Sequence, residues 1–362
     1  MPTSAPRPSG FRIVLSALVL VGLAACGRPG LPVPPEQRLP AAAANLTAIV
    51  RAGGVELHWV NPTRRVDGKP LRDLTIAQVL RSDNGAEGVI PSAVLSRGRI
   101  PGYNEIAAIR LAEPSPATVV GSAVTLVDRA GLVIGRRYTY VVVTSDSERR
   151  TSPPSSRLTV SFIATPGPPR DLAADASEGE VRLRWAPPAQ LSDGSPPGDL
   201  SYEILRGPRA GNALVPVSAT PTADRTFVDR SVANDQTYRY AVRAIRIVAE
   251  TRAIGEPSDA IAATPLDLTP PSPPRDLVAI PSERTVRLSW RPNPEADLAR
   301  YVVYRAGATG DFQRIGSVEP SATVFVDRDL APGRYRYAVT AEDTSISKNE
   351  SARSNDVTVS IP

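Results

Sequence analysis

The most regular stretch of the chain alternates charged and apolar residues, as Glu180-Val181-Arg182-Leu183-Arg184-Trp185. Side chains of a β-strand point alternately to its two faces, so this pattern predicts a half-buried strand with the tryptophan and the two aliphatic residues inward. Related stretches end at Trp59 and Trp290, and a proline follows each tryptophan within three residues. This recurrence predicts that one strand-rich unit occurs three times.

A second block also occurs three times, at 125–143, 226–244 and 324–341. It consists of an apolar residue, then Val-Asp-Arg, and after six to eight further residues Tyr-x-Tyr with more alternating apolar positions. We expect a short strand, a turn and a longer strand that has Tyr238, Tyr240, Val242 and Ala244 on one face. Short strands separated by turns at this spacing are typical of an all-β sandwich of about 100 residues.

These residues carry a family resemblance. The Pro-Pro-x-x-Leu sequence at 168–172, the alternating strand ending in tryptophan and the Tyr-x-Tyr block resemble the fibronectin type III domain. The resemblance implies a fold of three tandem immunoglobulin-like (fibronectin type III) β-sandwiches, at 41–165, 168–265 and 272–362. It also implies that the tryptophans pack between the sheets and that the first tyrosine of each pair returns its hydroxyl to nearby backbone. The residues concerned are Trp59, Trp185 and Trp290, and Tyr138, Tyr238 and Tyr335. The family often has Val or Phe at the second tyrosine.

The first repeat is longer than the others. From its tryptophan to its repeated aspartate there are 69 residues, against 44 and 37 in the second and third repeats, and the extra residues fall mostly between positions 83 and 120. Loops added to a β-sandwich are where binding residues gather. We therefore regard this insertion as the candidate partner contact; the alternative is variation in length without a role. Its candidate contact residues are Arg97, Arg99, Tyr103, Asn104 and Glu105.

The N-terminus predicts export. Two arginines precede an apolar run at 13–23, which is typical of a secretory signal peptide and too short for a membrane span. Leu23-Ala24-Ala25-Cys26 resembles the bacterial lipobox, which implies cleavage after residue 25 and acylation of Cys26, palmitate included. The alternative is an unmodified thiol in an uncleaved signal. Gly27 after the cysteine implies the outer membrane, and the prolines within 26–40 predict an extended tether.

Charge is uneven but does not identify a ligand. Residues 27–167 contain 17 basic and 11 acidic residues, whereas 168–362 contain 23 and 26. Weak attraction of the first domain to anionic lipid head groups is one interpretation, and ordinary solvated faces are the favoured one. Nucleic acid is disfavoured because basic residues do not cluster with aromatic ones.

Catalytic chemistry has little support. His58 is the only histidine and is expected to point outward; with a single cysteine, a Cys/His zinc cluster is excluded. Asp128, Asp229 and Asp327 occur once per repeat, which favours an ion pair or turn that the fold needs over a catalytic pair. Acids in the loops fit turn chemistry, with a calcium site as the alternative. These acids are Asp67, Asp73, Asp193 and Asp199. No cofactor is expected.

Together these features predict a non-catalytic lipoprotein, held in the bilayer through acylated Cys26 and facing the periplasm or the cell surface. It would act as a binding or spacer module for an envelope or surface protein or polysaccharide. Sandwiches about 33 Å long give an array on the order of 100 Å. The alternatives are a periplasmic accessory subunit of outer-membrane assembly and, third, a glycan-active hydrolase.

Overall fold

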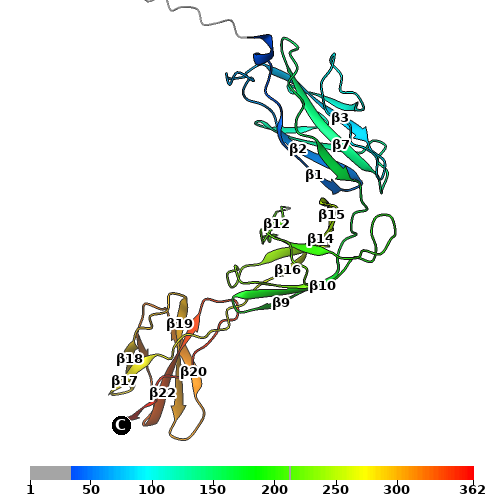
Figure 1. Ribbon diagram of the computed structural model, residues 1–362. Coiled ribbons are helices and arrows are strands. Elements are labelled where there is room, and N and C mark those ends of the chain that lie inside the picture. The colour runs from blue at the N-terminus through cyan, green and yellow to red at the C-terminus, as the bar shows by residue number, and fades with distance from the viewer. Residues whose placement is uncertain (1–33, 212) are drawn as a thin grey trace, which may run out of the picture.

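The structure is a computed structural model and describes residues 34–211 and 213–362. The signal peptide, Cys26 and most of the proline-rich tether lie outside the described residues. One short 3-10 helix, η1 (Pro35–Gln37), precedes an otherwise all-β arrangement. Within the described residues no helix is long and apolar enough to cross a membrane. Figure 1 shows three β-sandwiches that follow one another along the chain.

The first sandwich pairs one sheet containing the tryptophan strand with a four-stranded sheet. Its first sheet has the order β1 (Ala44–Arg51), β2 (Gly54–Val60), β6 (Ala123–Asp128) and β5 (Thr118–Val120). Its second has the order β4 (Asn104–Arg110), β3 (Leu74–Asp83), β7 (Arg137–Asp146) and β8 (Leu158–Ser161).

The second sandwich follows the same plan with one addition, a long hairpin. Its three-stranded sheet is β13 (Thr226–Asp229), β10 (Glu180–Ala186) and β9 (Arg170–Ser177). Facing it are β12 (Val215–Pro216), β11 (Ser201–Pro208), β14 (Tyr238–Val248) and β16 (Ile261–Ala263), with β15 (Thr251–Pro257) completing the hairpin.

The third sandwich is the most regular. Its three-stranded sheet is β17 (Arg275–Ser282), β18 (Thr285–Arg291) and β21 (Val324–Asp327). The four-stranded sheet is β20 (Gln313–Val318), β19 (Leu298–Gly307), β22 (Gly333–Asp343) and β23 (Val357–Ile361). Two facing sheets, one of them containing the tryptophan strand, occur three times along the chain and confirm the predicted all-β fold of tandem fibronectin type III sandwiches.

Each sandwich has its own core around its tryptophan. The alternating strand β10 places Val181, Leu183 and Trp185 inward, with 0%, 0% and 6% of their surfaces exposed. Trp185 packs edge-on against Tyr202, with ring centroids 5.5 Å apart. Edge-to-face pairs of this kind contribute about 0.5–1.5 kcal/mol beyond the burial of their area. The predicted core roles of Trp59, Trp185 and Trp290 are confirmed.

The first two sandwiches share a sheet, a feature that the repeat pattern does not predict. Strand β14 runs past its counterparts and turns into β15, which pairs in parallel with β1 of the first sandwich through Val50 with Ala253 and Arg51 with Ile254. The backbone N–H of Ser161 also donates to the hydroxyl of Thr251 at 2.9 Å. A nine-stranded sheet therefore runs through both sandwiches.

Candidate functional site

The extra residues of the first repeat fold against the sandwich. Twenty residues, 84–103, separate β3 from β4, where five separate the corresponding β19 and β20. Ile100 and Tyr103 from this segment are 2% and 8% exposed and pack on Val141 and Val143 of β7. These valines lie on the face of the β4-β3-β7-β8 sheet opposite the main core, which in a sandwich ordinarily meets solvent. The insertion thus builds a second, smaller core on the outside of the sheet.

A hollow of about 550 Å³ lies between this segment and the sheet. Apolar side chains line part of it, Leu80, Leu95 and Ile100 among them. Its polar lining includes Gln78 and Glu105, whose side chains share a hydrogen bond of 2.6 Å. An apolar wall beside a few polar groups is the usual composition of a ligand site.

Four of the five predicted contact residues are exposed: Arg97, Arg99, Asn104 and Glu105. Three of these four line the hollow, and Arg97 stands in the adjacent turn. Tyr103 differs, because its ring belongs to the small core and its hydroxyl donates to the carbonyl oxygen of Pro91 at 3.1 Å. Burial raises the pKa of Tyr103. Tyr103 therefore has a structural role in the small core, and the exposed side chains of Arg99, Asn104 and Glu105 lie at the rim of the hollow.

The aspartate that recurs in each repeat is buried in an ion pair. It accepts a hydrogen bond from an arginine of the neighbouring sheet and another from the second tyrosine of the Tyr-x-Tyr block. The groups are Asp128 with Arg81 and Tyr140, Asp229 with Arg206 and Tyr240, and Asp327 with Arg305 and Tyr337, at 2.7–2.9 Å. We call each of these an Asp-Arg-Tyr group. The arginine is not the one that follows the aspartate in the sequence.

The tyrosines explain where this sequence departs from the family pattern. The first tyrosine of each pair is hydrogen-bonded through its hydroxyl to nearby backbone, as predicted for Tyr138, Tyr238 and Tyr335. The same ring lies under the arginine of the group, 5.1–5.7 Å from the guanidinium carbon. The second tyrosine replaces an apolar residue because its hydroxyl donates to the buried carboxylate.

The charge state of this group is clear in the second sandwich. Burial acts to raise the pKa of Asp229, but hydrogen bonds from Ser231, Arg206 and Tyr240 outweigh it and hold the pKa below its ordinary range. Burial and the adjacent carboxylate raise the pKa of Tyr240. At neutral pH the aspartate is ionised and its partners are fixed donors, which is a structural arrangement and not a pair of catalytic carboxylates.

The remaining sequence candidates have local roles. The side chain of His58 is 41% exposed and lies 2.9 Å from Glu56 on the outward side of β2. Asp67 and Asp193 accept hydrogen bonds from backbone N–H groups two residues later, which is the turn chemistry expected of them. Asp73 pairs with Arg65 at 2.6 Å.

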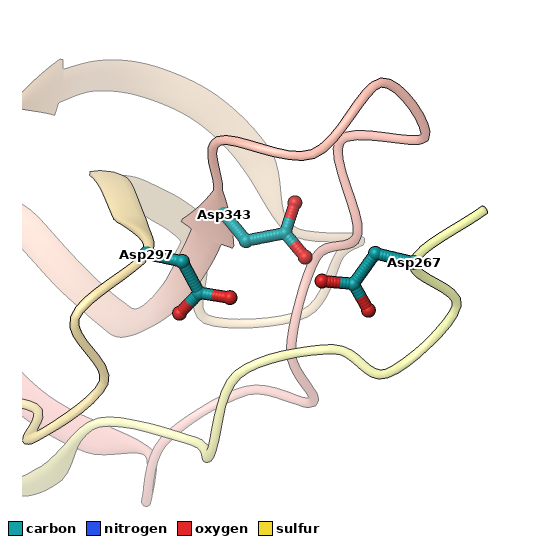
Figure 2. Close-up of side chains that lie close together, drawn as sticks. All are labelled: Asp267, Asp297 and Asp343. Atoms are coloured by element: carbon teal, nitrogen blue, oxygen red, sulfur yellow. The ribbon is translucent and has the colours of Figure 1, made fainter. Parts of the chain in front are cut away.

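A cluster of three acids lies at the junction of the second and third sandwiches. Figure 2 shows the carboxylates of Asp267, Asp297 and Asp343 pointing toward one another from separate segments. One oxygen from each lies within 4.8 Å of the others. Among the described residues none of the three forms an ion pair with a basic side chain. Carboxylate oxygens in such a group are the ligands that Ca²⁺ prefers.

Only one member of this cluster could have been marked from the sequence. Asp297 precedes β19 as Asp73 precedes β3, so the repeat alignment could have marked one member. Asp267 belongs to the connection between sandwiches, and its approach to the other two depends on how the domains are joined.

The chain was also compared with known protein families and with solved structures. No family model matches the chain. Among solved structures it is similar to the FN1–FN3 domains of chicken CNTN1, at 16% identity, covering 89% of this chain and 99% of that one, with a TM-score of 0.28. At that TM-score the likeness supports no functional argument, and the fold assignment stands on the sheets described above.

Proposed function

We propose that this protein is a non-catalytic, lipid-anchored module outside the cytoplasm that binds an envelope or surface protein or polysaccharide. The folded insertion of the first sandwich is the observation that carries the proposal. It forms a hollow with exposed polar residues at its rim, on a domain that shares a sheet with the next one. A binding surface that is already ordered loses less conformational entropy when a partner binds.

The anchor is part of the proposal. Cys26 is the only cysteine, and the lipobox-like sequence before it supports acylation, with Gly27 favouring the outer membrane. Two or more acyl chains hold a protein stably on a bilayer. Cys26→Ser is expected to move the protein from the membrane fraction to the soluble fraction, with loss of the lipid mass. Continued membrane fractionation of this variant would contradict lipidation as the anchor.

In-cell crosslinking tests the binding surface. A photoreactive residue at Arg99 is expected to trap a specific partner, since this position lies on the rim of the hollow. Arg314 provides the matched control because it is exposed on β20, the strand of the third sandwich that corresponds to β4. Identical partners at both positions, or none at Arg99, would count against the hollow as the contact.

The second candidate function, a periplasmic accessory subunit of outer-membrane assembly, is favoured by the basic first domain beside the tether. Protease treatment of intact cells separates the two candidates. Cleavage means exposure at the cell surface and supports adhesion or surface binding. Protection until the outer membrane is permeabilised means a periplasmic location and supports the accessory role.

A further inference from the structure

We propose that Arg275 and Arg291 of the third sandwich bind the carboxylate of an acidic sugar, and that the ligand is a uronic-acid polysaccharide lying along the outward face of the β17-β18-β21 sheet. This site goes beyond the function proposed above and does not rest on it, because it uses other residues on another sandwich. Three features support it: an arginine pair without a counterion, a pocket beside that pair, and the difference between this repeat and the other two.

The two arginines stand directly opposite each other on neighbouring strands. Arg275 begins β17 and is paired with Arg291, the last residue of β18. Both are exposed, and within residues 34–211 and 213–362 neither side chain forms an ion pair or a hydrogen bond. Like charges at directly opposite positions of a sheet destabilise the pair. An anionic ligand would supply the counterion that these residues do not.

The other sandwiches show that the fold does not require this pair. At the same register the second sandwich has Arg170 opposite Ala186, and the first has Ala44 opposite Val60. The second arginine, which directly follows the tryptophan, occurs in the third repeat alone. Because the second sandwich forms with alanine at this position, Arg291 is better explained by a ligand than by the needs of the strand pairing.

A pocket of about 350 Å³ lies beside the two arginines and has both in its wall. We call it the arginine pocket. The rest of its lining consists of three prolines, one hydroxyl group and one amide, from Pro273, Pro292, Pro294, Ser272 and Asn293. A small concave site with apolar walls and a few polar groups is the usual composition of a ligand site.

The groups in the arginine pocket match those of a sugar that carries a carboxylate. Guanidinium groups bind carboxylates through paired, charge-assisted hydrogen bonds. Asn293 donates both of its amide hydrogens within the protein, at 2.7 Å to the carbonyl oxygen of Ser272 and at 3.0 Å to Glu295. Its own carbonyl oxygen is therefore left to accept from a sugar hydroxyl. The proline rings offer apolar surface to the C–H groups of the sugar ring.

Glu295 does not neutralise the arginines. Its carboxylate accepts from the backbone N–H of Ser272 at 2.8 Å and from Asn293 at 3.0 Å, and in the part of the chain that the structure describes it forms no ion pair. Burial acts to raise the pKa of Glu295, but these hydrogen bonds outweigh it and lower the pKa to about 2. The ionised carboxylate is thus held by other donors.

The sheet beside the pocket presents apolar and basic residues without an acid. Across its outward face the paired rows are Val278–Ser289–Val324 and Ile280–Arg287–Val326. The aliphatic residues Val278, Ile280 and Val324 expose 50%, 57% and 37% of their surfaces. In the second sandwich the corresponding row contains an acid, Asp175, opposite Arg182. Exposed aliphatic residues that lie together mark an interaction surface.

Arg287 extends the site from one sugar to several. It lies four residues before Arg291 on the same face of β18, which is about 13 Å along a strand. It is exposed and forms no ion pair with any residue that the structure describes. A second carboxylate of the same polymer can therefore bind there, and linked contacts of this kind raise the overall affinity.

The size of the face favours a linear polymer over a second copy of this chain. Three strands of about eight residues cover on the order of 400 Å², about half of what each partner contributes to a stable protein interface. Two copies of this face would also bring arginines against arginines. A narrow chain with regularly spaced carboxylates meets neither difficulty.

Isothermal titration of the detergent-solubilised full-length protein with a short oligogalacturonate, at low ionic strength, tests the site. Arg291→Ala should weaken binding at least about tenfold, because the carboxylate loses one guanidinium. Arg291→Lys keeps the charge but not the paired donors and should weaken binding about threefold. Arg184→Ala removes an exposed arginine from the corresponding sheet of the second sandwich and should leave binding unchanged.

Other ligands separate the sources of affinity. A neutral maltooligosaccharide of the same length should not bind. The galacturonate monomer should bind more weakly than the oligomer, and Arg287→Ala should weaken binding of the oligomer but not of the monomer. Native-like affinity in Arg291→Ala, or no binding of the oligogalacturonate, would overturn the proposal. Inorganic phosphate that binds as tightly as the oligomer would show an adventitious ion only, and would overturn the polysaccharide as ligand.

Discussion

At the scale of single residues, the Asp-Arg-Tyr group is a buried charged interaction that recurs in all three sandwiches. Asp229 is 2% exposed, accepts from Arg206 and Tyr240, and is also bonded to Ser231. A buried carboxylate with all its partners is stable, whereas a buried charge that has lost its partner is costly. Removing Asp229 or Arg206 should therefore strongly destabilise the second sandwich.

Asp229→Asn is expected to lower the free energy of unfolding of the second sandwich by about 3 kcal/mol, because Arg206 loses its counterion. Tyr240→Phe should cost about 1.5 kcal/mol, the value of a hydrogen bond to a charged group. Hydrogen exchange of the β14 amides measures both. Asp259→Asn, at an exposed position, is the control. Equal effects of Asp229→Asn and Asp259→Asn would contradict the assigned role.

The same group predicts a pH dependence. The pKa of Asp229 is lower in the folded domain than its value of about 3.9 in an unfolded chain, so its contribution is complete above that value and is lost as pH falls through the folded pKa. The stability difference between the native protein and Asp229→Asn should therefore shrink on acidification from pH 7 to about pH 3. A difference that stays constant over this range would show that the carboxylate is not stabilised by its partners.

At the scale of elements, two additions separate this chain from a plain repeat: segment 84–103 and the β14–β15 hairpin. The segment depends on its small core, to which Ile100 belongs with 2% of its surface exposed, whereas Val94 of the same segment is 63% exposed. Ile100→Ala should cost about 2 kcal/mol or more of local stability and open the segment. Limited proteolysis between positions 86 and 95 should become faster in Ile100→Ala and stay unchanged in Val94→Ala.

The hairpin has a strained turn. Ala249 and Glu250 both have positive φ, at 45° and 64°, a conformation that two-residue hairpin turns require and that Asn and Gly adopt most easily. Ala249→Asn combined with Glu250→Gly should stabilise the hairpin by about 1 kcal/mol, seen as slower hydrogen exchange in β15. Glu256→Gly in the same hairpin should instead destabilise it. Faster exchange after the double substitution would contradict the turn assignment.

At the scale of the whole molecule, the joints between sandwiches differ in kind. Backbone pairing of β15 with β1 makes the first and second sandwiches share a sheet, while the third is attached at the acidic junction. Shared strands unfold together more readily than domains joined by a connecting segment.

Calorimetry should accordingly show two transitions, one for the first two sandwiches and one for the third. Ala253→Pro should divide the larger transition, because proline removes a backbone N–H from a residue paired with both β14 and β1. Three transitions in the native protein would show that the shared sheet does not couple the domains.

The sequence by itself determined the repeating part of this protein. Alternation around Trp185 and the recurring Val-Asp-Arg and Tyr-x-Tyr blocks specify strand, face and core position, because these depend on the period of a β-strand. The location of the insertion also followed, by comparison of repeat lengths. These are local properties, and each copy supports the others.

The tertiary structure decided which residues from distant segments of the chain meet. Arg206 as the partner of Asp229, the burial of Tyr103, the pairing of β15 with β1 and the approach of Asp267 to the third sandwich all join segments that are distant in sequence. The sequence pattern predicts the face of the strand on which a side chain lies. It does not predict which residues of other segments pack against that face. Those opposing surfaces contain the candidate site of this protein, the hollow.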